Sequence, residues 1–162
     1  MNSDLIKQES LKYLKELDAG LVPDYLKKDY FEYEKHHIIM VLLSLTKDFK
    51  DLTTDDVFDY LEPLEENRCL FEENIFQRIA ENTNFFEKQY WNEIIELHHS
   101  AYNLIRPGWW DEIRQGSNNW INIMKISNQL IDKLHIKKID SIDYSERYID
   151  DEILIKITKA KR

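Results

Sequence analysis

The sequence predicts a mainly α-helical bundle of about six or seven helices in a single domain, residues 1–162. Only three glycines and three prolines interrupt the 162 residues, so helices can run long. Apolar residues recur every three to four positions through most of the chain, which is the spacing of amphipathic helices. The hydrophobic content of 43% is ordinary for a globular protein, and a chain of this length forms a core without a metal or a disulfide.

Two long helices are expected at the start of the chain. The first begins at Ser3, a good N-cap residue, and ends at Gly20, which readily adopts the left-handed conformation that stops a helix. The second follows Pro23 and runs from Asp24 to about Lys47. Its apolar and aromatic residues share one face with His37, so we expect that histidine in the core.

Three further helices are expected in the middle of the chain. Thr53 or Thr54 caps the third, and Pro63 shortens or kinks it. The apolar spacing predicts a fourth helix over Cys69–Glu81. Asn84, with a glutamate three positions later, is a start signal for the fifth.

The last third of the chain mixes two patterns. Ser117 is expected to begin a long helix that ends near Leu134. Beyond it, the segments Ile136–Ile139 and Glu152–Thr158 contain short β-branched runs with alternating polarity. Such runs are typical of strands, so the sequence predicts a small C-terminal β-hairpin.

Two Glu-x-x-His pairs are the sharpest sign of chemistry. Glu34 with His37 and Glu96 with His99 match the pattern by which helical bundles hold two metal ions. Helical geometry opposes the second pair, because Glu96 falls opposite the apolar stripe that contains His98. We therefore expect Glu96 to face solvent, His98 to be a core histidine, His36 and His99 to be exposed, and no cofactor. A di-metal site at Glu34, His37, Glu96 and His99 is the alternative.

No pattern in the sequence indicates an enzyme. Cys69, the single cysteine, is surrounded by acidic residues, which raise the pKa of a thiol and make it less reactive. Glycine-rich phosphate loops and paired-cysteine zinc motifs are absent from the sequence. We expect the protein not to be an enzyme.

Negative charge is concentrated in one part of the chain. Residues 51–100 contain thirteen carboxylates and three basic residues, so their charge is −10. The net charge of the whole chain is −9, and the other residues together carry +1. A field of one sign attracts cationic surfaces and repels nucleic acid and anionic lipid. This run predicts a binding face for a cationic partner, with a merely solvated surface as the alternative. The residues expected to form the face are Asp55, Asp56, Asp59, Glu62, Glu65, Glu66, Glu72 and Glu73.

Trp109 and Trp110 follow a Pro-Gly break and complete the predicted partner-binding residues. Adjacent residues point in different directions, so one indole is expected to be partly exposed, and tryptophan is a common interface anchor. The alternative is that both rings hold their loop against the bundle.

In size, acidity and lack of a catalytic signature, the chain resembles the immunity proteins that bacteria carry against polymorphic or contact-dependent toxins. The resemblance implies a cognate toxin with a basic surface, often a nuclease, that is bound and blocked. Neither a signal peptide nor a long apolar segment is recognisable, so we expect a cytoplasmic protein that contacts neither membrane nor nucleic acid. An acidic nucleic-acid mimic acting as an interaction module is a further alternative.

Overall fold

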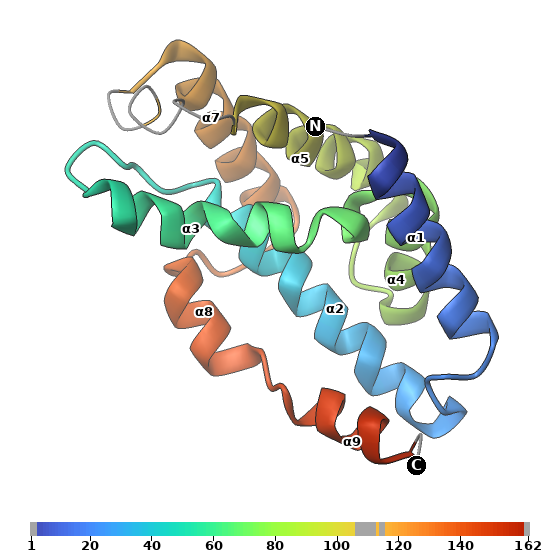
Figure 1. The fold of residues 1–162 in the computed structure, drawn as a ribbon. Coiled ribbons are helices and arrows are strands. Elements are labelled where there is room, and N and C mark those ends of the chain that lie inside the picture. Colours follow the sequence, from blue (N-terminus) through green and yellow to red (C-terminus); the bar gives the residue numbers. More distant parts are fainter. Residues whose placement is uncertain (1–2, 106–112, 114–115, 161–162) are drawn as a thin grey trace.

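The computed structural model describes residues 3–105, 113 and 116–160, and all regular structure in these residues is helical (Figure 1). The mainly α prediction is confirmed. The elements are α1 (Ser3–Asp18), α2 (Asp24–Ser44), α3 (Thr54–Glu66), η1 (Arg68–Phe71), α4 (Glu73–Thr83), η2 (Lys88–Tyr90), α5 (Trp91–Leu104), α7 (Asn118–Lys133), α8 (Ser141–Tyr148) and α9 (Glu152–Ala160).

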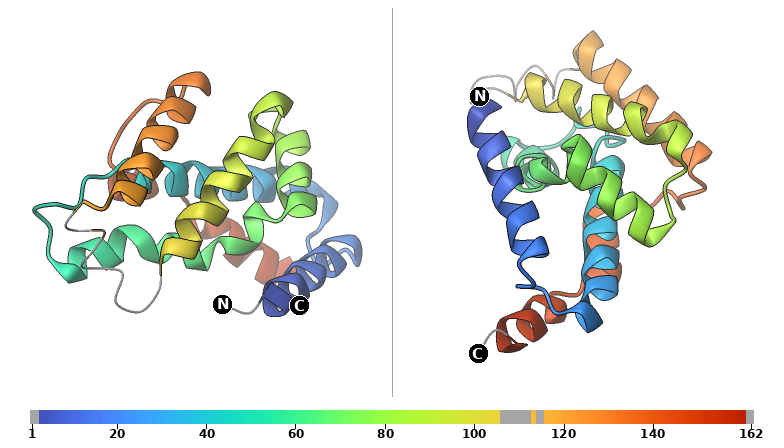
Figure 2. Two further views of the ribbon diagram at one scale, coloured as in Figure 1. Left: turned by 90° about the horizontal axis from the view of Figure 1, so that it is seen from above. Right: turned by 90° about the vertical axis from the view of Figure 1, so that its right-hand side faces the viewer.

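The long helix α2 is the centre of the fold. Every residue from Ile38 to Leu45 is buried, so this part of the helix is surrounded on all sides. It packs against α3, α4, α7, α8 and α9, and Figures 1 and 2 show α8 and α9 following its length. The Tyr33 hydroxyl donates to Asp151 at 2.9 Å and joins α2 to the start of α9. Among the described residues, no helix is long and apolar enough to cross a membrane.

Two predicted helix starts are confirmed by their caps. The Thr53 hydroxyl accepts a hydrogen bond from the Asp56 amide at 3.1 Å, at the start of α3. The Ser117 hydroxyl accepts one from the Trp120 amide at 3.2 Å, at the start of α7. Pro63 lies inside α3, which continues to Glu66.

The expected boundaries around α4 are wrong. The predicted helix over Cys69–Glu81 is two elements, η1 and α4, and Asn84 ends α4 instead of starting the next helix. Its φ of 53° is left-handed, and its amide donates to the Ala80 carbonyl at 3.0 Å. Asparagine suits both ends of a helix, because it caps a start through its side chain and tolerates the left-handed region at an end.

The predicted C-terminal hairpin is also wrong, because α8 and α9 occupy that region. Asp140 caps α8 by accepting from the Ile142 amide at 2.9 Å, and the Asp150 side chain accepts from the Glu152 amide at the start of α9. Ile153 and Ile157, four positions apart, are buried where α9 meets α2. The alternating isoleucines therefore belong to a short amphipathic helix.

Candidate partner-binding surface

Helix α3 has one apolar and one acidic side. Val57, Leu61 and Leu64 are buried and hold the helix against α2 and α5. At about 100° per residue, the opposite side carries carboxylates spaced four, three and four positions apart. All four side chains are exposed, and together we call them the acidic stripe: Asp55, Asp59, Glu62 and Glu66.

Among the residues that the structure describes, no lysine or arginine pairs with the acidic stripe. None of its carboxylates forms an ion pair with any described residue. Partial desolvation, followed by the charges of Glu62 and Glu65, raises the pKa of Glu66. Glu62 and Glu66 also lie near the C-terminal end of α3, where the helix dipole disfavours negative charge. Helix stability therefore does not explain Glu62 and Glu66, whereas Asp55 lies in the first turn of α3, where the helix dipole favours a carboxylate.

The structure places the other predicted acidic residues in different surroundings. Asp56 is exposed in the first turn of α3, whereas a Glu65 carboxylate oxygen lies 3.9 Å from the Arg68 guanidinium. Glu72 and Glu73 lie at the start of α4, where the helix dipole favours negative charge. The predicted site residues Trp109 and Trp110 lie outside the described residues.

The thiol of Cys69 is hydrogen-bonded to a carboxylate. Its thiol lies 3.3 Å from Glu9 Oε2 and donates to it, while Arg68 binds the other oxygen of Glu9 at 2.7 Å. This arrangement ties η1 to α1.

The two Glu-x-x-His pairs lie in different environments. Glu34 is buried, with 8% of its surface exposed, and burial raises its pKa to about 7. His37, expected in the core, is only half-buried, and its Nδ1 donates a hydrogen bond to the Tyr33 carbonyl at 3.0 Å. Glu96 and His99 are exposed on α5, as expected. Among the described residues, no three or more His, Cys, Asp or Glu side chains come together as a metal site.

His98 is a core residue, as predicted. Its Nε2 donates to the Leu64 carbonyl at 3.0 Å, and its ring stacks on Phe71 at 4.0 Å between centroids. Burial lowers the pKa of His98 to about 4, so the ring is neutral at pH 7. His36, expected to be exposed, is instead half-buried, because α8 covers it and the Tyr144 hydroxyl lies 2.7 Å from its Nδ1.

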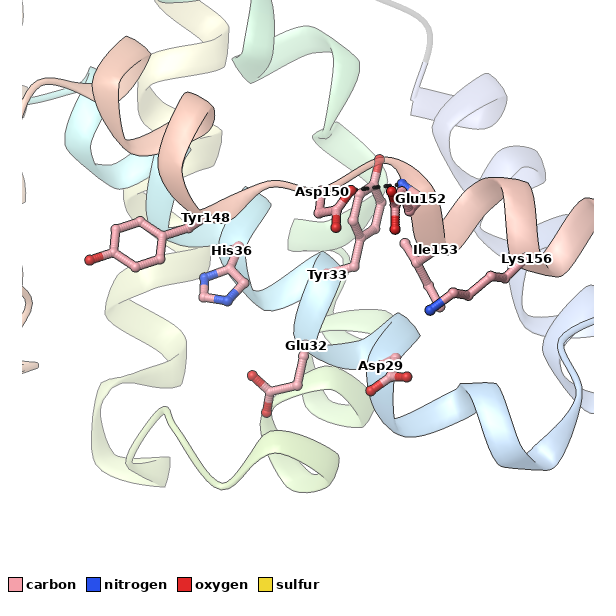
Figure 3. Close-up of a pocket in the computed structure, with 9 residues that line it drawn as sticks. All are labelled: Asp29, Glu32, Tyr33, His36, Tyr148, Asp150, Glu152, Ile153 and Lys156. Carbon is pink, nitrogen blue, oxygen red and sulfur yellow. Dashed lines mark hydrogen bonds between the residues drawn. The ribbon is translucent and has the colours of Figure 1, made fainter.

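A second acidic feature was not predicted from the sequence. A pocket of about 200 Å³ lies between α2 and the segment that joins α8 to α9, and we call it the acidic pocket. Figure 3 shows the residues that line it. Asp29 and Glu32 reach it from α2, and Asp150 and Glu152 from the other wall, with Lys156 beside them. The two walls are more than a hundred residues apart in the sequence, so local patterns do not reveal the pocket.

The chain matches no protein-family model, and no curated protein or solved structure is significantly similar to it.

Proposed function

We propose that this protein binds a cationic protein partner through the acidic stripe of α3 and thereby inhibits it, as an immunity protein blocks its toxin. The observation that supports this is the stripe itself: four exposed carboxylates on one side of a helix, none of them paired with a cation among the described residues. Like charges at this spacing destabilise a helix, so the stripe costs stability. Departures from local rules of this kind are common at functional sites.

The physical role of the stripe is to accelerate association. Complementary charge raises the rate at which two proteins meet by roughly ten to a thousand times, and salt suppresses the effect. An inhibitor benefits from this, because it must bind its target before damage occurs. Three buried residues anchor α3, so the backbone positions from which the carboxylates extend are fixed before binding.

The proposal predicts that a large secreted protein with a variable C-terminal domain is encoded immediately upstream of this chain, and the test uses that domain. Co-expression should protect cells from that domain, and the purified proteins should bind. Replacing Asp55, Asp59, Glu62 and Glu66 with lysine should slow association by about tenfold or more at low salt and weaken its salt dependence.

A matched control distinguishes the stripe from net charge. Replacing the exposed carboxylates of Asp29, Asp143, Glu146 and Glu152 with lysine changes the net charge equally but leaves α3 intact. The control variant should retain most of the association rate. Equal slowing in both variants, or full protection by the α3 variant, would contradict the proposal.

A further inference from the structure

A second pocket lies directly beside the acidic one. It encloses about 200 Å³ between α2, the loop after α4, the α7–α8 connection and α8. His36 and Tyr148 line both pockets and form the wall between them, and Figure 3 shows this wall from the acidic side. We call the second one the cationic pocket.

The charge of the cationic pocket is opposite to that of the protein. Lys35, His135, Lys137 and Arg147 line it, and none of the described residues lining it is a carboxylate. Lys137 and Arg147 are exposed and form no ion pair with any described residue. Among the described residues, a carboxylate pairs with one cation of the pocket: Glu32, next to the pocket, pairs with Lys35. Unpaired cations in a concave site attract anions.

The remaining walls of the pocket are aromatic and apolar. Tyr144 and Tyr148 lie 4.6 Å apart between ring centroids, and His36 stacks on Tyr148 at 5.7 Å. Phe85 closes another side and lies under the Lys35 ammonium, 5.1 Å from it. Tyr148 is 48% exposed, so much of its ring is open to a ligand. Such walls suit a planar ring.

His135 occupies a position that the backbone would give to glycine. Its φ of 57° is left-handed, and it ends α7 in a Schellman motif. The His135 amide donates a hydrogen bond to the backbone carbonyl of Asp132 at 3.1 Å, and the Ile136 amide donates one to the backbone carbonyl of Ile131 at 3.0 Å. Glycine or asparagine is usual there, and a histidine costs stability. Its side chain lines the cationic pocket, so a role in binding explains why a histidine occupies this unfavourable position.

We propose that the cationic pocket binds a small organic anion built from one planar ring and a carboxylate or phosphate group. The ring lies against Tyr144 and Tyr148, and the anionic group pairs with Lys137 and Arg147, with His135 as a further donor. The volume is below the roughly 300–1,000 Å³ of pockets for drug-sized ligands, so a single ring fits and a dinucleotide does not. The proposal is independent of the acidic stripe.

The direct test is a nuclear magnetic resonance titration with phenyl phosphate and with benzoate at constant ionic strength. Saturable shifts of the backbone amides of residues 135–139 and 144–148 are expected, and the tighter of the two probes identifies the acidic group. Inorganic phosphate and benzyl alcohol, which lack the ring and the charge respectively, should bind about tenfold more weakly or worse. Equal shifts with benzyl alcohol, no saturation with either anion, or shifts spread over all surface cations would overturn the proposal.

Variants test the assigned residues. Lys137→Gln and Arg147→Gln should each weaken binding by about tenfold, whereas Lys125→Gln, which removes an exposed cation of α7 away from the pocket, should not. His135→Gly should raise the melting temperature and yet weaken binding, and a folding defect cannot produce this pair of results. Unchanged affinity in the Lys137→Gln/Arg147→Gln double variant would refute the proposal.

Discussion

Glu34 and His98 are both ionisable and both buried, yet they make stability depend on pH in opposite directions. They are 8% and 2% exposed, in α2 and α5 respectively. Burial disfavours the charged form of each, so it raises the pKa of Glu34 to about 7 and lowers the pKa of His98 to about 4. The core favours the neutral form of both side chains, and the sign of the pH effect depends on whether the neutral form carries the proton.

The signs follow from proton binding. Folded Glu34 binds its proton more tightly than the unfolded chain, whose pKa is 4.5, so stability is highest below pH 4.5 and falls towards pH 7. Folded His98 binds its proton less tightly than the unfolded chain, whose pKa is 6.5, so stability falls as pH drops from 6.5 to 4. Each effect is about 3 kcal/mol in total, and the two largely cancel between pH 4.5 and 6.5.

The largest expected change in stability comes from removing the buried imidazole ring of His98. His98→Ala should lower the free energy of unfolding at pH 7 by about 4 kcal/mol, because it leaves a cavity beside Phe71 and an unpaired Leu64 carbonyl. Urea denaturation measures the change. The exposed neighbour provides the control, and His99→Ala should change stability by less than about 0.5 kcal/mol. A similar loss in both variants would show that His98 is not the core residue described above.

Removing the ionisable group of Glu34 tests the loss of stability that this residue causes as the pH rises. Glu34→Gln should raise the free energy of unfolding at pH 8 by about 2 to 3 kcal/mol and change it little at pH 4, where the natural side chain is already protonated. Denaturation at the two pH values measures this difference. Glu96→Gln, at an exposed site, should behave alike at both. A stabilisation independent of pH would contradict the assigned cause.

The pH dependence of stability that His98 causes can be removed while an aromatic ring is kept at this position. His98→Phe preserves stacking on Phe71 but leaves the Leu64 carbonyl without its donor, so it should cost about 1 to 2 kcal/mol at pH 7. At pH 4 the natural protein has lost the His98 contribution, and the variant should be the more stable of the two. The absence of this crossover would mean that His98 is not held neutral by burial.

The smallest expected effect concerns an exposed carboxylate. The pKa of Glu66 is also raised, by partial desolvation and by Glu62, but water screens this pair. Glu62→Gln should stabilise the protein by less than about 0.5 kcal/mol, and 1 M salt should abolish the gain. A larger effect would show that charge repulsion in the acidic stripe destabilises the protein as strongly as the burial of Glu34 and His98 does.

Local sequence patterns predicted the features that depend on a few neighbouring residues. Thr53 and Ser117 cap helices as expected, because a cap involves atoms only three residues apart. The burial of His98 and the exposure of Glu96 followed from the 100° step of the helix. The acidic residues of α3 were recognised from the concentration of charge alone, and the prediction did not separate the acidic stripe from Asp56 and Glu65.

Contacts between distant segments were not predictable in this way. His36 is covered by Tyr144, 108 positions later, and the acidic pocket forms only when α9 lies along α2. The isoleucines of α9 alternate as in a strand, and only the buried pair Ile153 and Ile157 distinguishes the helix. The left-handed His135 gave no sequence signal either, since glycine or asparagine is the usual marker of that conformation.

The placement of α8 and α9 along α2 also determines when the fold can be completed during translation. The hydrogen bond from Tyr33 to Asp151 joins residues 118 positions apart. At about 5 to 20 residues per second, a ribosome needs roughly 6 to 24 s to make the intervening chain. During that time one side of α2 remains uncovered, whereas α3, α4 and α7 can already pack against the rest of the helix. Nascent chains stalled before α8 should therefore bind chaperones that recognise apolar helices.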